Sequence, residues 1–244
     1  MNKKEMPIYI RIMISGFVVF LGILTIIATA EQRPTPKITT YNAEYQFSLI
    51  QVERPKIADK RYGTQKIDAV ETNQKYKSVF EDDMVRILWF VDNKNVSFLL
   101  QNKTDHSIKI SWDEAAYVDE LGRSHRVMHS GIKYTDREKP QAPSVIVRKG
   151  SIEDIVYPTD YVIFSSGTKY SAGSWDEKPL LFYKDFHSID SPGKYNSIDE
   201  FGKAVNANIG KQIQILLPLQ IQDVINDYIF IFNIDKVNVF KKAY

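Results

Sequence analysis

Between residues 98 and 127 the chain alternates apolar and polar positions in short runs that polar turns separate. Ile108, Ile110 and Trp112 are each followed or preceded by a polar residue. A period of two places one set of side chains in a core and the other in water. Turn candidates rich in Asn, Asp and Gly flank this run at residues 102–105 and 119–122. The stretch therefore predicts consecutive β-strands.

Strand-like runs continue on both sides of this stretch, from about residue 41 to residue 234. Prolines within residues 136–147 make that segment an edge strand or a crossover between two sheets. The pattern predicts an all-β fold, an immunoglobulin-like sandwich of two antiparallel sheets that spans residues 38–244. The expected strands are residues 41–49, 84–91, 96–100, 108–112, 116–118, 124–128, 152–156, 161–164, 212–222 and 228–234.

Two segments depart from the strand pattern. Residues 54–77 are polar without clear periodicity and predict a long loop, either a partner-binding surface or a solvated connection. Residues 197–210 predict one short helix, because Ser197 can cap the first turn and Glu200 can reach back to it. Its apolar residues Ile198, Phe201 and Val205 fall on one face, so the helix is expected to pack across one end of the sandwich.

The N-terminus has the pattern of an export signal. A basic start precedes 19 uncharged residues, Ile12 to Ala30, which end in Ala28-Thr29-Ala30. The small residues suit signal peptidase, and the run is also long enough to cross a bilayer. Residues 1–30 are therefore a cleaved signal peptide or a retained transmembrane signal anchor, and residues 31–37 a proline-containing linker. The expected membrane-anchoring residues are Ile12, Phe17, Phe20, Leu24 and Ile27.

This pattern predicts the location of the rest of the chain. Basic residues before the apolar run stay in the cytoplasm, so residues 31–244 are expected beyond the inner membrane. They are anchored there, or exported to the periplasm or surface if cleavage follows Ala30.

Composition and charge narrow the classes of function. The 244 residues carry a net charge of +2, and the first 30 residues account for all of it. A neutral body argues against nucleic acid as a partner, since such binding needs a concentrated basic face. The chain has no cysteine, which excludes disulfides, thiol catalysis, cysteine zinc sites and a lipid-modified N-terminal cysteine.

No motif predicts catalysis, a cofactor or a metal. The chain lacks a Gly-x-Ser-x-Gly elbow and a phosphate-binding Gly-x-x-x-x-Gly-Lys loop. His125 and His129 would lie roughly 13 Å apart on one strand face, too far to share a metal. Polar or capping roles are expected for His106 and His187. A solvated rim is expected for the acidic residues Asp113, Glu114, Asp119 and Glu120.

The runs FLLQNKT, SIKISW, YVDELGRSHRV and the pair ILLPLQI and YIFIFNI carry a resemblance to a known group. In this order they resemble poorly characterised bacterial envelope proteins with an immunoglobulin-like sandwich, many of which are lipoproteins. The resemblance covers roughly residues 98–127 and 212–239. It implies a place in the cell envelope and no reaction. This chain departs from the lipoprotein pattern because no cysteine follows its signal segment.

The aromatic residues suggest where a partner binds. Tyr170, Trp175 and Tyr183 flank a glycine-containing loop, and such side chains are enriched in protein interfaces. We therefore expect a non-enzymatic envelope protein that binds another envelope protein as an assembly or scaffolding subunit. The competing hypothesis is an exported hydrolase or carbohydrate-binding protein, which predicts a pocket where carboxylates converge with Trp112 or Trp175.

Overall fold

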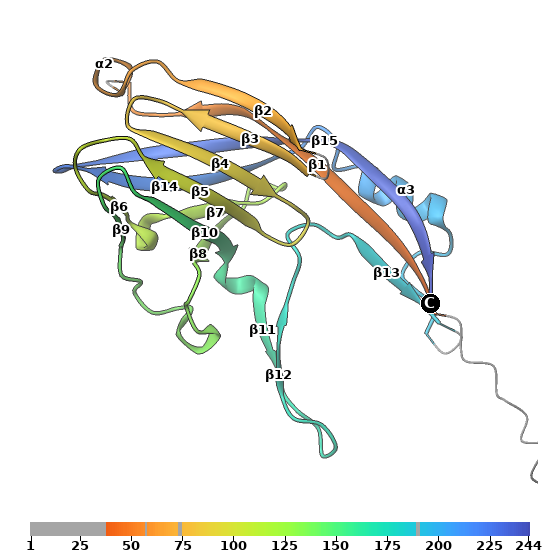
Figure 1. Cartoon of the computed structure of the whole chain (residues 1–244). Helices are drawn as coiled ribbons and strands as arrows, with labels where there is room; N and C mark the ends of the chain where they lie inside the picture. The colour runs from red at the N-terminus through yellow and green to blue at the C-terminus, as the bar shows by residue number, and fades with distance from the viewer. Residues whose placement is uncertain (1–37, 57, 73–74, 189–190) are drawn as a thin grey trace, which may run out of the picture. The chain divides into compact units, whose positions relative to one another are not determined.

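The described part of the chain is mostly β-structure (Figure 1). The computed structural model describes residues 38–56, 58–72, 75–188 and 191–244, all within the unit Ile38–Tyr244. The strands are β1 (Thr39–Glu53), β2 (Lys66–Thr72), β3 (Lys75–Glu81), β4 (Val85–Val91), β5 (Val96–Asn102), β6 (Ile108–Ile110), β7 (Ala116–Val118), β8 (Ser124–Met128), β9 (Ser144–Ile146), β10 (Ser151–Pro158), β11 (Val162–Ser165), β12 (Ser174–Glu177), β13 (Lys184–His187), β14 (Gln212–Ile221) and β15 (Val224–Ala243). The helices are α2 (Ala58–Tyr62) and α3 (Ile198–Asn206), with 3-10 turns η1 (Trp112–Glu114), η2 (Tyr134–Asp136) and η3 (Thr159–Tyr161).

One curled antiparallel sheet contains most of these strands. Its order is β13-β1-β15-β14-β7-β8-β10-β5-β4-β3-β2, with β6 and β9 attached beside β14. The curl brings the two halves of the sheet face to face, and aromatic side chains from both halves fill the space between them. Trp89 of β4 lies 4.7 Å from Phe230 of β15 between ring centroids, and Phe80 of β3 lies 5.5 Å from the same ring.

The strands expected around residue 110 form, but the strand expected at residues 108–112 ends at Ile110, and Trp112 begins the 3-10 turn η1. Ile108, Ile110 and Trp112 are fully buried, as the alternation predicts. The turn at residues 92–95 joins β4 to β5, and the Asp92 carboxylate accepts hydrogen bonds from the N–H groups of Lys94 and Asn95. A side chain that accepts from the backbone two residues on is the reason Asp favours such turns.

The prediction of a long loop at residues 54–77 is wrong. That segment forms α2, β2 and the start of β3, and β2 and β3 pair from Lys66↔Glu81 to Thr72↔Lys75. β2 lies at the edge of the sheet and bears the exposed charged residues Lys66 and Asp68. Charged side chains on an edge strand prevent further pairing, and they also weaken the apolar alternation by which a strand is recognised.

The predicted helix is confirmed with its cap. The Glu200 N–H donates to Ser197 Oγ at 3.1 Å, and the Glu200 carboxylate accepts from the Asn196 N–H at 3.0 Å. Phe201 and Val205 are buried against the end of the sheet, where Phe201 lies 6.0 Å from Tyr41 of β1 between ring centroids. A second, five-residue helix, α2, was not expected.

A buried ion pair joins the two halves of the curled sheet. Asp82 lies in the turn between β3 and β4, and its Oδ2 lies 2.9 Å from Nη1 of Arg54, just after β1. The same oxygen accepts a bond from the Tyr228 hydroxyl of β15 at 3.0 Å. Asp82 Oδ1 accepts from the N–H groups of Met84 and Val85. Burial, followed by the nearby Asp82 charge, raises the pKa of Tyr228 and keeps its hydroxyl protonated as a donor.

Side chains also bridge the edge of β1 to the opposite half of the sheet. Asn93, in the β4–β5 turn, accepts from the Tyr45 N–H at 3.1 Å and donates to the Ala43 carbonyl at 2.8 Å. Further along, the Leu49 N–H donates to the Ser78 hydroxyl of β3 at 3.1 Å. These bonds occupy backbone groups of β1 that no strand pairs with at these positions.

Replacing Asp82 tests whether the ion pair holds the halves together. Asp82→Asn keeps the shape of the side chain but removes the negative charge beside Arg54. We expect the free energy of unfolding to fall by on the order of 3 kcal/mol, because the variant removes the negative charge that lies against a buried guanidinium. Thermal unfolding of the full-length chain in mild detergent, followed by tryptophan fluorescence, measures the change.

Tyr228→Phe is the matched control, because it removes one hydrogen bond to the same carboxylate and no charge. This substitution should lower the free energy of unfolding by about 1 kcal/mol. If both variants lose the same small amount of free energy of unfolding, the charge of Asp82 does not hold the two halves together.

Candidate functional site

A two-stranded hairpin stands apart from the curled sheet. β11 and β12 pair only with each other, from Val162↔Glu177 to Ser165↔Ser174. Figure 1 shows this hairpin, residues 162–177, extending away from the other strands, and we call it the arm. A lone two-stranded hairpin is at best marginally stable in water, so the contacts at its base matter for its order.

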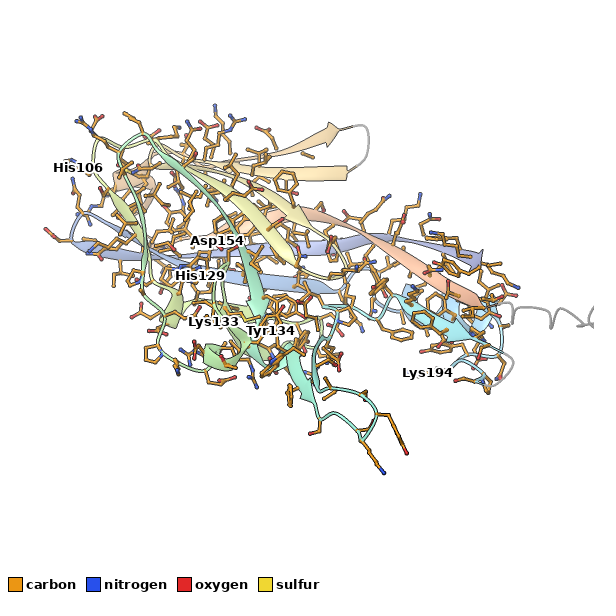
Figure 2. All side chains as sticks on the ribbon, turned by 60° about the horizontal axis from the view of Figure 1, so that its bottom comes forward. His106, His129, Lys133, Tyr134, Asp154 and Lys194 are labelled. Atoms are coloured by element: carbon orange, nitrogen blue, oxygen red, sulfur yellow. The ribbon has the colours of Figure 1, made fainter. Side chains whose placement is uncertain are left out.

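Aromatic contacts hold the base of the arm. Trp175 lies 5.1 Å from Phe164 across the hairpin and 5.9 Å from Tyr134 of η2 between ring centroids. The Arg137 guanidinium lies 5.0 Å from the Trp175 ring, a cation–π geometry. The Tyr134 hydroxyl donates to the Glu177 carboxylate. Figure 2 labels Tyr134 and its neighbour Lys133 beside this base.

The arm exposes large apolar side chains both near its base and at its tip. Tyr170, at the tip, is 90% exposed, and Ile163 and Phe164 are each more than half exposed. The tip is closed by a tight turn in which the Thr168 N–H donates to the Ser171 carbonyl at 2.9 Å. A side chain at Gly173 would collide with the Phe164 ring, so this glycine allows the ring to lie against the hairpin. The exposed apolar area is available to a partner.

The structure brings together two of the three aromatic residues expected to bind a partner. Tyr170 and Trp175 both belong to the arm. Tyr183 does not, because it precedes β13, where its carbonyl accepts from the Ala43 N–H at 2.8 Å and its ring packs against the core. The spacing of tyrosine and tryptophan does not mark Ile163 and Phe164 as partner-binding residues, although both lie in the apolar run at residues 161–164.

The five expected anchor residues Ile12, Phe17, Phe20, Leu24 and Ile27 lie outside the described residues. Within residues 38–244, as far as the structure describes them, no helix is both long and apolar enough to span a membrane.

His125 lies between two carboxylates. Its Nδ1 is 2.9 Å from Asp160 Oδ2, and its Nε2 is 3.3 Å from Asp119 Oδ2. The expectation that Asp119 belongs to a solvated rim is wrong, because its side chain is fully buried. Burial opposes its ionisation, but the Arg123 guanidinium and the N–H groups of Arg123 and Leu121 outweigh this and lower the pKa of Asp119 to about 2.

His129 pairs with a different carboxylate. Its Nδ1 lies 3.3 Å from Asp154 Oδ2, and Figure 2 shows the two side chains next to each other. The His129 ring stacks on Trp112, with 4.5 Å between centroids and 8° between planes. Asp154 is buried, which opposes ionisation, yet bonds from His129 and the Ser130 and Ile155 N–H groups lower its pKa.

The histidines thus stabilise the fold around them in separate pairs. His187 Nε2 lies 3.0 Å from Asp185 Oδ2, while its Nδ1 accepts from the Gly193 N–H at 3.3 Å. His106 is exposed in its turn. Among the described residues, no three acidic, histidine or cysteine side chains are placed to hold one metal ion. Trp112 is fully buried and offers no face to a sugar, and the Trp175 ring lies among Phe164, Tyr134 and Arg137.

No family model, curated protein or solved structure matches this chain.

The Asp119 cluster predicts a pH dependence of stability. The folded-state pKa, about 2, lies below the ordinary value of 3.8. The ionised carboxylate therefore stabilises the fold fully above about pH 4, and this contribution is lost as the pH falls toward 2. Asp119→Asn should lower the free energy of unfolding by about 1–3 kcal/mol at pH 7, and the gap to the unaltered protein should narrow below pH 4. Thermal unfolding at several pH values measures both effects.

Asp160→Asn is the control, because its exposed carboxylate contacts the same histidine from the other side. It should change stability by less than about 1 kcal/mol. If the difference in free energy of unfolding between Asp119→Asn and the unaltered protein stays constant down to pH 2, the ionised Asp119 carboxylate does not stabilise the fold.

Proposed function

We propose that this protein is a non-enzymatic subunit of the cell envelope that binds another envelope protein through its arm. In this proposal residues 1–30 export the chain or anchor it in the inner membrane, and residues 38–244 act outside the cytoplasm as an immunoglobulin-like sandwich. The resemblance of residues 98–127 and 212–239 to bacterial envelope proteins supports the location. The face-to-face halves of the sheet, with β15 opposite β3 and β4, support the sandwich.

The observation that carries the binding function is the exposure of Ile163, Phe164 and Tyr170 on a hairpin that is fixed only at its base. Leaving such side chains in water forgoes the free energy that burial would supply. Interfaces concentrate their binding energy in a few aromatic and apolar residues surrounded by polar ones. The serines, threonine and lysine of residues 165–171 provide such polar surroundings at the tip.

A site-specific cross-link tests this function in cells. A photoreactive phenylalanine analogue replaces Tyr170 in the full-length chain, and light should join it to one envelope protein, which mass spectrometry identifies. Adding Ile163→Lys should reduce the adduct about tenfold or more, as expected for a residue that contributes about 1.4 kcal/mol or more to binding.

Leu121 provides the matched control position. It is 60% exposed in the turn between β7 and β8 and lies outside the arm. The analogue at Leu121 should yield no such adduct, and the thermal stability of the Ile163→Lys variant should be unchanged, because the new lysine lies opposite Asp176. Equal cross-linking from residues 121 and 170, or an adduct that Ile163→Lys leaves intact, would show that the arm is not the binding surface.

A further inference from the structure

Three strand segments come together where the described chain begins and ends. The first residues of β1 lie between β13 and the last residues of β15, with Thr40 paired to both Phe186 and Lys242. The Tyr244 N–H donates to the Ile38 carbonyl at 2.9 Å. Figure 1 shows this meeting of β13, β1 and β15 beside the marked C-terminus.

Directly paired residues of antiparallel strands project from the same face of a sheet, and successive residues alternate between faces. The odd-numbered residues here face α3, since Tyr41 contacts Phe201 and Val239 lies beside Gly202. The even-numbered residues therefore project from the opposite face. We call this surface the end face. Thr40 and Asn42 are buried at its centre, and its other members are Ile38, Lys184, Phe186, Phe240, Lys242 and Tyr244.

The end face combines exposed apolar side chains with lysines. Tyr244 is 64% exposed, and Phe186 and Ile38 are also exposed. The Lys184 ammonium lies 4.4 Å from the centroid of the Phe186 ring, and that of Lys242 lies 5.8 Å from the Tyr244 ring.

The charge of this surface is one-sided. The even-numbered positions carry three lysines and one carboxylate, Glu44. They are counted over residues 38–46, 184–186 and 236–244. Aromatic rings with lysines whose stems lie along them are typical of the membrane–water interface, where the ammonium reaches lipid phosphates.

The length of chain before Ile38 brings this surface close to a membrane. Seven residues, 31–37, separate the uncharged run from Ile38. At about 3.3–3.6 Å per residue they span at most about 25 Å. If residues 12–30 are retained in a bilayer, the end face is held within that distance of the headgroups. Ile38, a member of the end face, is the first described residue after the predicted anchor and linker.

We propose that the end face docks on the anionic phospholipid headgroups of the membrane that holds the N-terminal segment. Its lysines bind lipid phosphates, and Ile38, Phe186 and Tyr244 enter the interfacial layer. This inference rests on the proposed retention of residues 1–30 as an anchor. It also gives the domain a fixed orientation on the membrane.

The chain has no native cysteine, so a single introduced cysteine can be labelled at a chosen position. Single variants Phe186→Cys and Tyr244→Cys of the full-length chain carry an environment-sensitive fluorophore. Each is reconstituted into phosphatidylcholine vesicles with or without phosphatidylglycerol, and a nitroxide on the lipid headgroup quenches the fluorescence. Ile225→Cys is the matched control, because Ile225 is 49% exposed and lies near the other end of the same strand, β15.

Quenching at residues 186 and 244 should exceed that at residue 225 several-fold in vesicles that contain phosphatidylglycerol. It should fall when the vesicles lack that lipid, and also when Lys184→Gln and Lys242→Gln are introduced together. Equal quenching at all three positions, or quenching at residues 186 and 244 that does not depend on the anionic lipid, overturns the proposal. Lipid-independent energy transfer between labels at residue 186 would identify a second copy as the occupant and overturns it also.

The experiment separates this inference from the one on which it rests. A chain that does not insert into the vesicles overturns the anchoring and the docking together. A chain that inserts but leaves residues 186 and 244 unquenched overturns the docking alone. Neither result bears on the arm, whose partner is detected by the cross-link at residue 170.

Discussion

The buried pair of Arg54 and Asp82 is the interaction on which the closure of the sheet depends. The strands that it joins, β1 and β15 on one side and β3 and β4 on the other, lie near opposite ends of the strand order. No backbone ladder links them there, so side chains must make the connection. Asp82 can do so because both of its oxygens are occupied, one by the turn that it caps and the other by Arg54 and Tyr228. A buried carboxylate is tolerated only with such complete pairing.

Closure by side chains has a consequence for the rest of the fold. Asn93 and Ser78 occupy backbone groups at the edge of β1 that would otherwise need water or another strand. These bonds cover the edge of β1, and Trp89, Phe230 and their neighbours fill the core. The sheet therefore does not need β11 and β12 to cover its edge or its core. The hairpin leaves the sheet, and its base is held by the ring contacts of Trp175 and by the hydrogen bond from Tyr134 to Glu177.

Local patterns predicted most strands and the helix, because alternation and the Ser197 cap are properties of neighbouring residues. They failed for β2, whose charged edge masks the alternation, and for Asp119, whose burial depends on Arg123 and His125 in the folded turn. They could not reveal the pairing of Arg54 with Asp82, 28 residues apart, since no sequence pattern marks it. The apolar run at residues 161–164 likewise predicts a strand but cannot tell whether that strand joins the sheet or leaves it as an arm.

The neutral charge of residues 31–244 constrains how the end face can act. Attraction between exposed charges is screened beyond about 8–10 Å at physiological ionic strength, so a few lysines cannot draw a neutral domain to a membrane from solution. A tether changes this, because a linker of seven residues keeps the lysines at a high effective concentration near the headgroups. The weak contacts of Lys184 and Lys242 then suffice to orient the domain. The same patch on a cleaved, freely diffusing chain would bind lipid poorly, so docking and retention of the N-terminal segment belong together.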